Sequence, residues 1–208
     1  MSRRAAPKAT TKLRRRLTTA RSACHAVANS TAVRSTEGSP VNQEATLLAQ
    51  AGALLARETL LLRTREFRQW LHLFTDDGAY WVPVSPLQTE PFSAPSHIYE
   101  ARPALDARIE RLYDRRMLPQ MPASRVSRLH SAPWLLSHGA DQMEVAVEFQ
   151  LMEARQVPDA ESELRMFAGE CQYQLVRDAA GAGAWRIQRK RVDLINSESA
   201  FFGVSILL

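Results

Sequence analysis

The stretch that decides the fold is Glu66–Val84, EFRQWLHLFTDDGAYWVPV. Its first half carries an apolar stripe at the i, i+3, i+4 and i+7 spacing of one helix face. The stripe is formed by Phe67, Trp70, Leu71 and Phe74. The next residues, TDDG at 75–78, predict a turn in which Gly78 can adopt a positive φ. Residues 80–84, YWVPV, are typical of a strand. We therefore expect a helix, a turn and a strand, with the helical stripe covering a sheet.

The rest of the chain predicts helices first and then antiparallel strands. The helical spacing recurs in a long segment, Asn42–Arg63, and in a short one, Leu105–Tyr113. Between them, the prolines of Ser85–Pro103 predict a long exposed loop. Alternating apolar and polar residues predict further strands at 124–134, 144–153, 164–177 and 185–194. This order of elements is typical of an α+β domain with a strongly curved sheet.

The positive charge of the chain is concentrated in its first forty residues. The 208 residues carry a formal net charge of +5. Residues 1–40 hold nine Lys and Arg against one acid, a net of +8, whereas residues 41–208 hold 18 basic and 21 acidic residues, a net of −3. We expect 1–40 to be a disordered basic tail, because it has no aromatic residue with which to build a core. Residues 41–208 are expected to form one domain.

Three explanations of the tail remain open. It resembles an Arg-rich organelle-targeting peptide or an arm that binds nucleic acid. The third explanation, which we favour, is a gene start placed too far upstream, since Val41 is where a GTG start codon would be read. The mildly acidic domain is then expected to have no nucleic-acid partner.

Cysteine usage and hydropathy indicate the cellular location to expect for the protein. Cys24 and Cys171 form no disulfide framework, which fits a cytoplasmic location. No apolar run approaches the roughly 20 residues that span a bilayer. We therefore expect no membrane partner.

Several segments, taken in order, resemble a known family. They are the two helices before residue 75, DDGAYWVP at 76–83, the proline-punctuated loop, SRVSRLH at 124–130, WRIQRKRVDL at 185–194 and the apolar ending SAFFGVSILL at 199–208. Over roughly residues 44–208 the chain is similar to the small (β) subunit of aromatic-ring-hydroxylating dioxygenases. Departures at Met117–Pro122 and at 134–136 leave the subfamily, and hence the aromatic substrate, open.

The resemblance implies a fold and a partner. The fold would be an NTF2-like cone, with N-terminal helices packed on a strongly curved, mostly antiparallel sheet. The chain would be the structural and assembly partner of a Rieske-type α subunit in an α3β3 hexamer, with the β subunits associated as a trimer. The α subunit would hold the [2Fe-2S] Rieske cluster and the mononuclear Fe(II). The complex would add both atoms of O2 to an aromatic ring during aromatic catabolism, with NAD(P)H as electron donor through a reductase.

This chain itself carries no ligand set for such metals. A Rieske cluster needs paired Cys and His ligands, and a mononuclear iron site needs two His and a carboxylate. The sequence shows neither spacing. We therefore expect no metal and no cofactor in this chain, and a subunit without a catalytic role.

Two alternatives of other classes remain. The first is a free-standing enzyme on the same cone fold, similar to ketosteroid isomerase or scytalone dehydratase, in which an acid or histidine works with a tyrosine. Its candidates are Asp76, Tyr80, Tyr99 and His130. Paired acids at Asp76 and Asp77 can raise the pKa of one carboxyl, although their role in a turn is the favoured interpretation. The second alternative is a small ligand-binding or assembly module.

Two basic strands are candidates for a subunit interface. Their arginines are Arg125, Arg128, Arg186, Arg189 and Arg191. Arginine forms bidentate contacts with carboxylates and is favoured in interface ion pairs. Alternation along a strand places Arg189 and Arg191 on one face and Lys190 on the other, a charged row that one subunit could not easily use internally. The apolar ending Ser199–Leu208 is expected to be buried in its own sheet or in a neighbouring subunit.

Overall fold

The structure is a computed structural model that describes residues 40–114, 123–155, 163–178, 183–199 and 206–208. All of these residues belong to one unit of the chain, 37–208. The predicted disordered tail lies outside them apart from Pro40 and remains a prediction. The segment Met117–Pro122, where the sequence departs from the resembled family, also lies outside the described residues.

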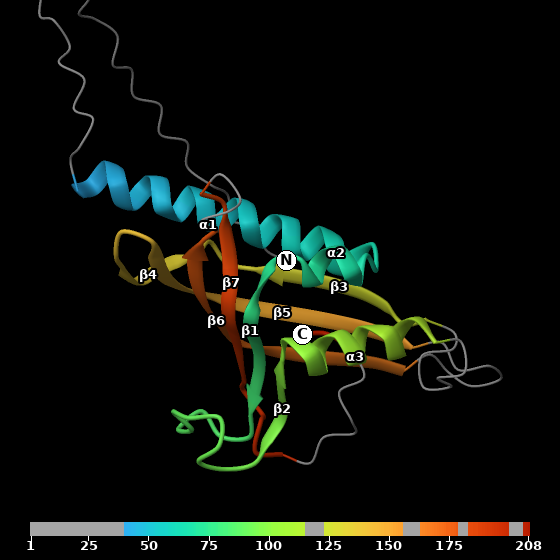
Figure 1. The fold of residues 1–208 in the computed structure, drawn as a ribbon. Helices are drawn as coiled ribbons and strands as arrows, with labels where there is room; N and C mark the ends of the chain where they lie inside the picture. Colours follow the sequence, from blue (N-terminus) through green and yellow to red (C-terminus); the bar gives the residue numbers. More distant parts are fainter. Residues whose placement is uncertain (1–39, 115–122, 156–162, 179–182, 200–205) are drawn as a thin grey trace, which may run out of the picture. The chain divides into compact units, whose positions relative to one another are not determined.

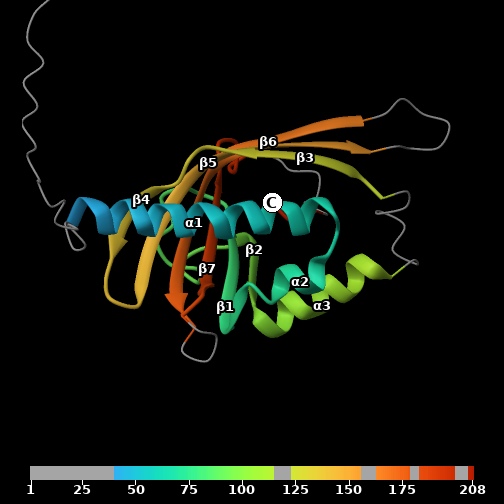
Figure 2. The same ribbon diagram turned by 90° about the horizontal axis from the view of Figure 1, so that it is seen from above.

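The described residues form one curled sheet covered by helices on its inner face (Figures 1 and 2). The helices are α1 (Pro40–Arg63), α2 (Phe67–Leu71) and α3 (Arg102–Tyr113). The strands are β1 (Phe74–Pro83), β2 (Ser96–Ala101), β3 (Arg125–His130), β4 (Trp134–His138), β5 (Gln142–Arg155), β6 (Glu163–Arg177) and β7 (Trp185–Leu194). The strand order is β2-β1-β7-β6-β5-β3, and β4 pairs with β5 beyond the end of β3.

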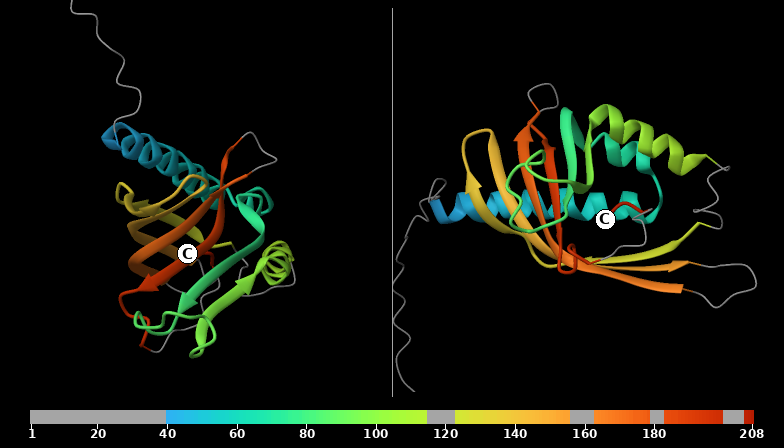
Figure 3. Two further views of the ribbon diagram at one scale, coloured as in Figure 1. Left: turned by 60° about the vertical axis from the view of Figure 1, so that its left-hand side comes forward. Right: turned by 90° about the horizontal axis from the view of Figure 1, so that it is seen from below.

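Most of the sheet is antiparallel, as predicted. Only β1 and β7 pair in parallel among the described strands. The sheet curls around α1, and α2 and α3 lie along its open side (Figure 3). Leu55, Trp70 and Leu105, one from each helix, are fully buried in the core. The predicted α+β class with a strongly curved sheet is confirmed.

Helix α1 corrects one expectation about hydropathy. Within Asn42–Arg63 a window reaches a mean hydropathy of 1.2, so by length and composition alone this helix could cross a membrane. The expectation that no apolar run approaches that length is wrong here. The structure supplies the reason for the composition, because the stripe of Leu47, Ala51, Leu55 and Leu62 is buried against the sheet.

The TDDG segment is a strand and not a turn. Phe74, expected in the helix, begins β1, and the pairing with β7 is irregular between Phe74 and Ala79. Gly78 has no positive φ. A Cβ at Gly78 would lie 2.9 Å from the carbonyl oxygen of Thr75, so glycine is needed for close approach of the backbone. The prediction of a turn is wrong because an irregular strand uses the same residue types.

The expected loop Ser85–Pro103 contains a strand that the prolines concealed. β2 occupies Ser96–Ala101 at the edge of the sheet, where strands tolerate neighbouring prolines. Pro103 lies in the first turn of α3, where its missing N–H removes no helical hydrogen bond. The single strand expected at 124–134 is two strands, β3 and β4.

Tyr80 and Trp81 are both fully buried, but on opposite faces of β1. Tyr80 belongs to the core under the helices. The indole of Trp81 lies on the outer face, where Nε1 donates to Ser96 Oγ at 2.9 Å and the Arg191 guanidinium stacks 4.5 Å from the ring centre. Trp81 therefore does not pack under the helical stripe. The loop after β1 helps to cover the Trp81 indole. Its Gln88 is buried and donates to the same Ser96 hydroxyl.

Gly169→Ala is expected to lower the free energy of unfolding by about 3 kcal/mol, because overpacking against a fixed neighbour is destabilising. A Cβ at Gly169 of β6 would lie 1.9 Å from the carbonyl oxygen of Asp193 on β7. The matched control is Gly139→Ala, whose Cβ would meet Gln142 Cγ at an ordinary 3.4 Å. Urea denaturation measures both. Equal midpoints for the two variants would contradict the close approach.

Candidate functional site: the filled cone and the outer face

The inner face of the curled sheet holds a buried polar cluster centred on Glu58 of α1. Trp70 Nε1 and Lys190 Nζ each donate to Glu58 Oε1 at 2.9 Å, and the Tyr173 hydroxyl donates to Oε2 at 2.7 Å. Glu58 is 3% exposed and Lys190 is 1% exposed. A buried charge is tolerated only when it is paired and hydrogen-bonded. This cluster meets both conditions with groups from α1, α2, β6 and β7.

Residues 206–208 extend the cluster through main-chain hydrogen bonds. Lys190 Nζ also donates to the main-chain oxygen of Leu208 at 2.8 Å, and the N–H of Leu208 donates to the Tyr80 hydroxyl at 3.1 Å. The Arg128 guanidinium donates to the main-chain oxygen of Leu207 at 2.6 Å. Ile206, Leu207 and Leu208 are all buried. The predicted burial of the apolar ending is confirmed for these three residues.

The surroundings of the cluster shift the pKa values of its titratable groups. Burial alone would raise the pKa of Glu58, but the Lys190 ammonium and the donated hydrogen bonds outweigh it, so the pKa is lowered. Burial raises the pKa of Tyr80, raises that of Tyr173, which also faces Glu58, and raises that of the Cys171 thiol to about 12. These shifts favour an ionised Glu58 beside neutral phenols and a neutral thiol at neutral pH.

The structure does not bring together the four residues considered for a proton-transfer enzyme. The Asp76 side chain is 96% exposed on β1. Tyr80 is in the interior, whereas Tyr99 lies on the outer face, because its cross-strand partner is Trp81. His130 lies on the edge strand β3, hydrogen-bonded through Nδ1 to a neighbouring carbonyl at 3.0 Å.

At Asp77 the pKa shift is opposite to the one considered for paired acids. Hydrogen bonds from Thr75 and Gln188 lower the pKa of Asp77. A carboxyl with a lowered pKa is a weak base at neutral pH.

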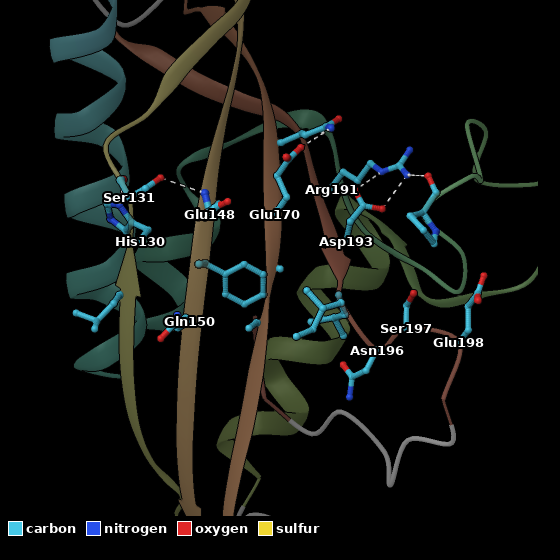
Figure 4. A pocket seen from close by; sticks show the side chains of 18 of the residues that line it. His130, Ser131, Glu148, Gln150, Glu170, Arg191, Asp193, Asn196, Ser197 and Glu198 are labelled. Atoms are coloured by element: carbon cyan, nitrogen blue, oxygen red, sulfur yellow. Dashed lines mark hydrogen bonds and ion pairs between the residues drawn. The ribbon is translucent and has the colours of Figure 1, made fainter.

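The outer face carries a polar groove of about 980 Å³ (Figure 4). Strands β3, β5, β6 and β7 and the turn after β7 form its walls. Asp193 lies in it, paired with the Arg191 guanidinium at 2.6 Å, and Glu170 accepts from Gln172 Nε2 at 2.8 Å. Glu148 also lines the groove. The groove is rich in carboxylates and amides, and it is open to a partner.

Next to this groove, exposed apolar side chains form a stripe on the same outer face. The outer apolar stripe consists of Leu129, Met152, Leu164 and Met166, which are 69%, 44%, 64% and 68% exposed. The strand registers place Met152 opposite Met166 and Leu129 opposite Gln150, which lines the groove. Contiguous exposed apolar surface beside a polar rim is typical of a protein interface.

Three of the arginines predicted to lie at an interface already have partners in the chain. Arg186 pairs with Asp178 at 3.6 Å, and Arg191 pairs with Asp193 at 2.6 Å. Arg128 donates to a main-chain oxygen at 2.6 Å. These contacts anchor β7 and β3 within the subunit. They do not require a second chain.

The other two arginines are more available. Arg125 is exposed, and Arg189 lies over an indole ring, 6.0 Å from its centre. Lys190 faces the interior, away from Arg189 and Arg191, as the alternation predicts. The expectation that one subunit could not use this row internally is wrong for Arg191, because a carboxylate two residues along the strand pairs with it. The interface assignment of the five arginines stays a prediction.

Comparison with known proteins decides the family. The sequence model of a family described as "Ring hydroxylating beta subunit" matches residues 57–199. The chain belongs to this family. It is similar to the small oxygenase component of the p-cumate 2,3-dioxygenase system of Pseudomonas putida, with 35% identity over 98 residues. The match covers 46% of this chain and 54% of the relative, so it spans about half the length of that protein.

Solved structures of β subunits share the fold. The β subunit of benzoate 1,2-dioxygenase from Burkholderia mallei superposes with a TM-score of 0.58 and 24% identity, covering 76% of this chain and 97% of its own. A chain of naphthalene 1,2-dioxygenase gives a TM-score of 0.62 at 18% identity, covering 79% of this chain and 86% of its own. At such identities the likeness shows the fold alone. The NTF2-like cone expected for a ring-hydroxylating β subunit is confirmed.

The described residues of this β-subunit chain contain no group of three or more His, Cys, Asp or Glu placed to hold a metal ion. Cys171 is buried among the core residues and is a free thiol. A Rieske cluster or a mononuclear iron therefore does not fit the side chains that the structure describes.

The sequence contains signals for the pair formed by Glu58 and Lys190. Glu58 stands in the apolar stripe of α1, at the same spacing as its leucines, and Lys190 occupies an inward position of β7 between two arginines. A lone charge at a core position predicts a buried partner of opposite sign. Two such positions in one domain indicate two buried charges, although their separation in sequence hides that they pair with each other.

Lys190→Met is expected to lower the free energy of unfolding by about 3 to 5 kcal/mol at neutral pH, because it leaves the Glu58 carboxylate buried without its counter-charge. The control is Glu110→Gln, which breaks an exposed ion pair with Arg68 whose side chains are 62% and 64% exposed. The control should keep the wild-type midpoint in urea. Equal urea midpoints for Lys190→Met and Glu110→Gln would contradict a stabilising contribution of the pair formed by Glu58 and Lys190.

The loss in Lys190→Met should also depend on pH. In the wild type, the lowered pKa of Glu58 contributes stability above its ordinary value of 4.5, which is lost as pH falls through the folded pKa. In the variant, burial raises this pKa, so protonation relieves the penalty. The stability difference should therefore begin to shrink above pH 4.5, as pH falls through the raised pKa of the variant, and should shrink further below pH 4.5 as the wild type loses its own contribution. Urea midpoints from pH 3 to pH 8 test this, and a constant difference would contradict it.

Proposed function

We propose that this chain is the β subunit of a multicomponent aromatic-ring-hydroxylating dioxygenase and that it serves as the assembly partner of a Rieske-type α subunit. The family match over residues 57–199 supports this function. The observation that carries the non-catalytic role is the filled cone. Glu58, Lys190, Tyr80 and Tyr173 bond to one another or to Leu208, so their reactive atoms are already engaged within the subunit.

The chemistry then belongs to the partner. In this proposal the α subunit holds the [2Fe-2S] cluster and the mononuclear Fe(II), and a reductase delivers electrons from NAD(P)H. The complex adds both atoms of O2 to an aromatic compound as a step in aromatic catabolism. We propose an α3β3 assembly with a trimer of β subunits, in the cytoplasm. The small oxygenase component of Pseudomonas putida, named for a p-cumate 2,3-dioxygenase system, supports a two-component oxygenase.

Two features of the subunit support its proposed role in assembly with the α subunit. The buried ion pair fixes α1, β7 and residues 206–208 to one another, which makes the inner face rigid. The outer face offers the polar groove and the outer apolar stripe. A rigid sheet that presents an apolar stripe beside a polar groove fits the core and rim of a subunit interface.

A free-standing isomerase or dehydratase is not favoured. Such an enzyme needs a base and an acid within reach of a substrate in the cone. Here the interior carboxylate, Glu58, is held by Lys190, and the Tyr80 hydroxyl accepts a main-chain N–H. Residues 206–208 occupy the adjoining space.

Met166→Asp is expected to yield a folded chain that no longer assembles, because it places a charge at the centre of the outer apolar stripe, where desolvation is costly. The variant is co-expressed with the α subunit and analysed by size exclusion with light scattering and by a dihydrodiol assay. Leu87→Asp is the control, since Leu87 is 87% exposed and lies outside the stripe. An intact complex with normal turnover for Met166→Asp would show that the outer apolar stripe is not part of the subunit interface.

The isolated chain should contain no stoichiometric iron. The described residues offer no ligand group, and the sequence shows no Rieske pairs. Elemental analysis and visible absorbance of the purified chain, compared with the co-purified complex, test this. Iron at one equivalent in the chain freed of its partner would contradict the assignment of the chemistry to the α subunit.

A further inference from the structure

Helix α1 ends in a Schellman motif with an unusual residue at its key position. The N–H of Glu66 donates to Leu61 O at 2.8 Å, and the N–H of Arg65 donates to Leu62 O at 3.3 Å. Arg65 has a φ of 59°, the one positive φ among the non-glycine residues that the structure describes. Glycine is the usual residue here, because a Cβ disfavours this conformation. An arginine held in such a conformation points to a function for its side chain.

The Arg65 side chain lies at a cavity of about 410 Å³. Its guanidinium stacks on Phe67, 5.2 Å from the ring centre. The end of α1, the end of α3 and the start of β3 lie at the same end of the sheet (Figure 2), and residues from all three line the cavity. We call it the arginine cavity. Its apolar walls are Leu62, Phe67, Leu112, Val126, Ile206 and Leu207.

The charge of the arginine cavity is unbalanced. Four arginines line it, Arg63, Arg65, Arg125 and Arg128, and no acidic residue does. None of the four forms an ion pair within the described ranges of the chain. The nearby acids are engaged elsewhere, since Glu110 pairs with Arg68 and Glu153 pairs with Arg165. The cavity therefore has an excess of positive charge without a resident counter-ion.

Arg128 has a buried hydrogen-bond donor that lacks an acceptor. Its Nη2 donates to Leu207 O at 2.6 Å, but its Nε is buried and has no hydrogen-bond partner. A buried donor without an acceptor is costly, and such groups usually have a ligand or a water.

We propose that the arginine cavity binds a small amphipathic carboxylate. Its apolar body would lie on the walls formed by Phe67, Leu112 and Val126, and its carboxylate would accept hydrogen bonds from Arg65 and Arg128. The volume falls within the range of small-molecule sites. The planar guanidinium fork matches a carboxylate, and apolar walls beside it strengthen the pairing. This inference does not depend on the proposed role of the chain in a dioxygenase.

The first test measures ligand chemistry on the full chain by isothermal titration calorimetry. The probe is 4-methylbenzoate, and the comparison compounds are 4-methylbenzyl alcohol, which keeps the apolar body, and acetate, which keeps the carboxylate. The expected result is saturable 1:1 binding of 4-methylbenzoate that weakens with added salt, and at least tenfold weaker binding of the other two. Equal binding of the alcohol, or no saturable binding of 4-methylbenzoate, overturns the proposal. An acidic residue of a partner protein would then be the occupant to consider.

The second test separates binding from folding. Arg65→Gly removes the guanidinium and relieves the backbone, so Tm should stay the same or rise while Kd for 4-methylbenzoate rises at least tenfold. Arg57→Gln is the control, because it removes one positive charge from an exposed position of α1 outside the cavity. Its Kd should match the wild type. An unchanged Kd in Arg65→Gly overturns the proposal.

A third variant covers the case in which Arg65→Gly alters the end of α1. Leu112→Glu places a carboxylate on the half-buried wall of the cavity, where it would neutralise the arginines and displace the probe. Binding should be lost while the circular dichroism spectrum is retained. Wild-type affinity in a folded Leu112→Glu variant would overturn the site.

Discussion

The interaction on which the structure depends is the buried carboxylate of Glu58, which receives hydrogen bonds from an indole, a phenol and the Lys190 ammonium. Lys190 adds a hydrogen bond to Leu208 O. One ion pair thus ties the long helix, the central strand β7 and residues 206–208 together. A buried pair is weak evidence for net stability, but removing one partner is costly, so the pair specifies how these elements meet.

The same arrangement supports the proposed non-catalytic role of the subunit. Reactive groups are useful when they face a cavity with a free proton or lone pair. Here the interior groups are engaged with one another, and the open surfaces lie on the outer face, in the polar groove and the outer apolar stripe. A subunit of the ring-hydroxylating β family is therefore best understood through its surfaces. The arginine cavity is the exception, because its positive groups lack acidic partners.

Much of the fold could be predicted from periodicity, because burial of one face imposes it. The spacing of apolar residues in α1 and the alternation in β5 both predicted buried faces that the structure confirms. What failed depended on tertiary contacts. β2 was hidden by neighbouring prolines, TDDG was an irregular strand, and Trp81 packs on the outer face under a loop. The site was missed for a related reason, since the pairing of Glu58 with Lys190 joins residues far apart in sequence.

The proposed action of the subunit through its outer face is tested most directly by hydroxyl-radical footprinting. Met152 and Met166 of the outer apolar stripe are 44% and 68% exposed, whereas Met143 is 2% exposed and serves as an internal reference. In the free chain, Met152 and Met166 should oxidise rapidly and Met143 slowly. In the complex with the α subunit, the account predicts strong protection of Met152 and Met166 and no change at Met143. Oxidation of the stripe methionines at the same rate in the complex would contradict the account.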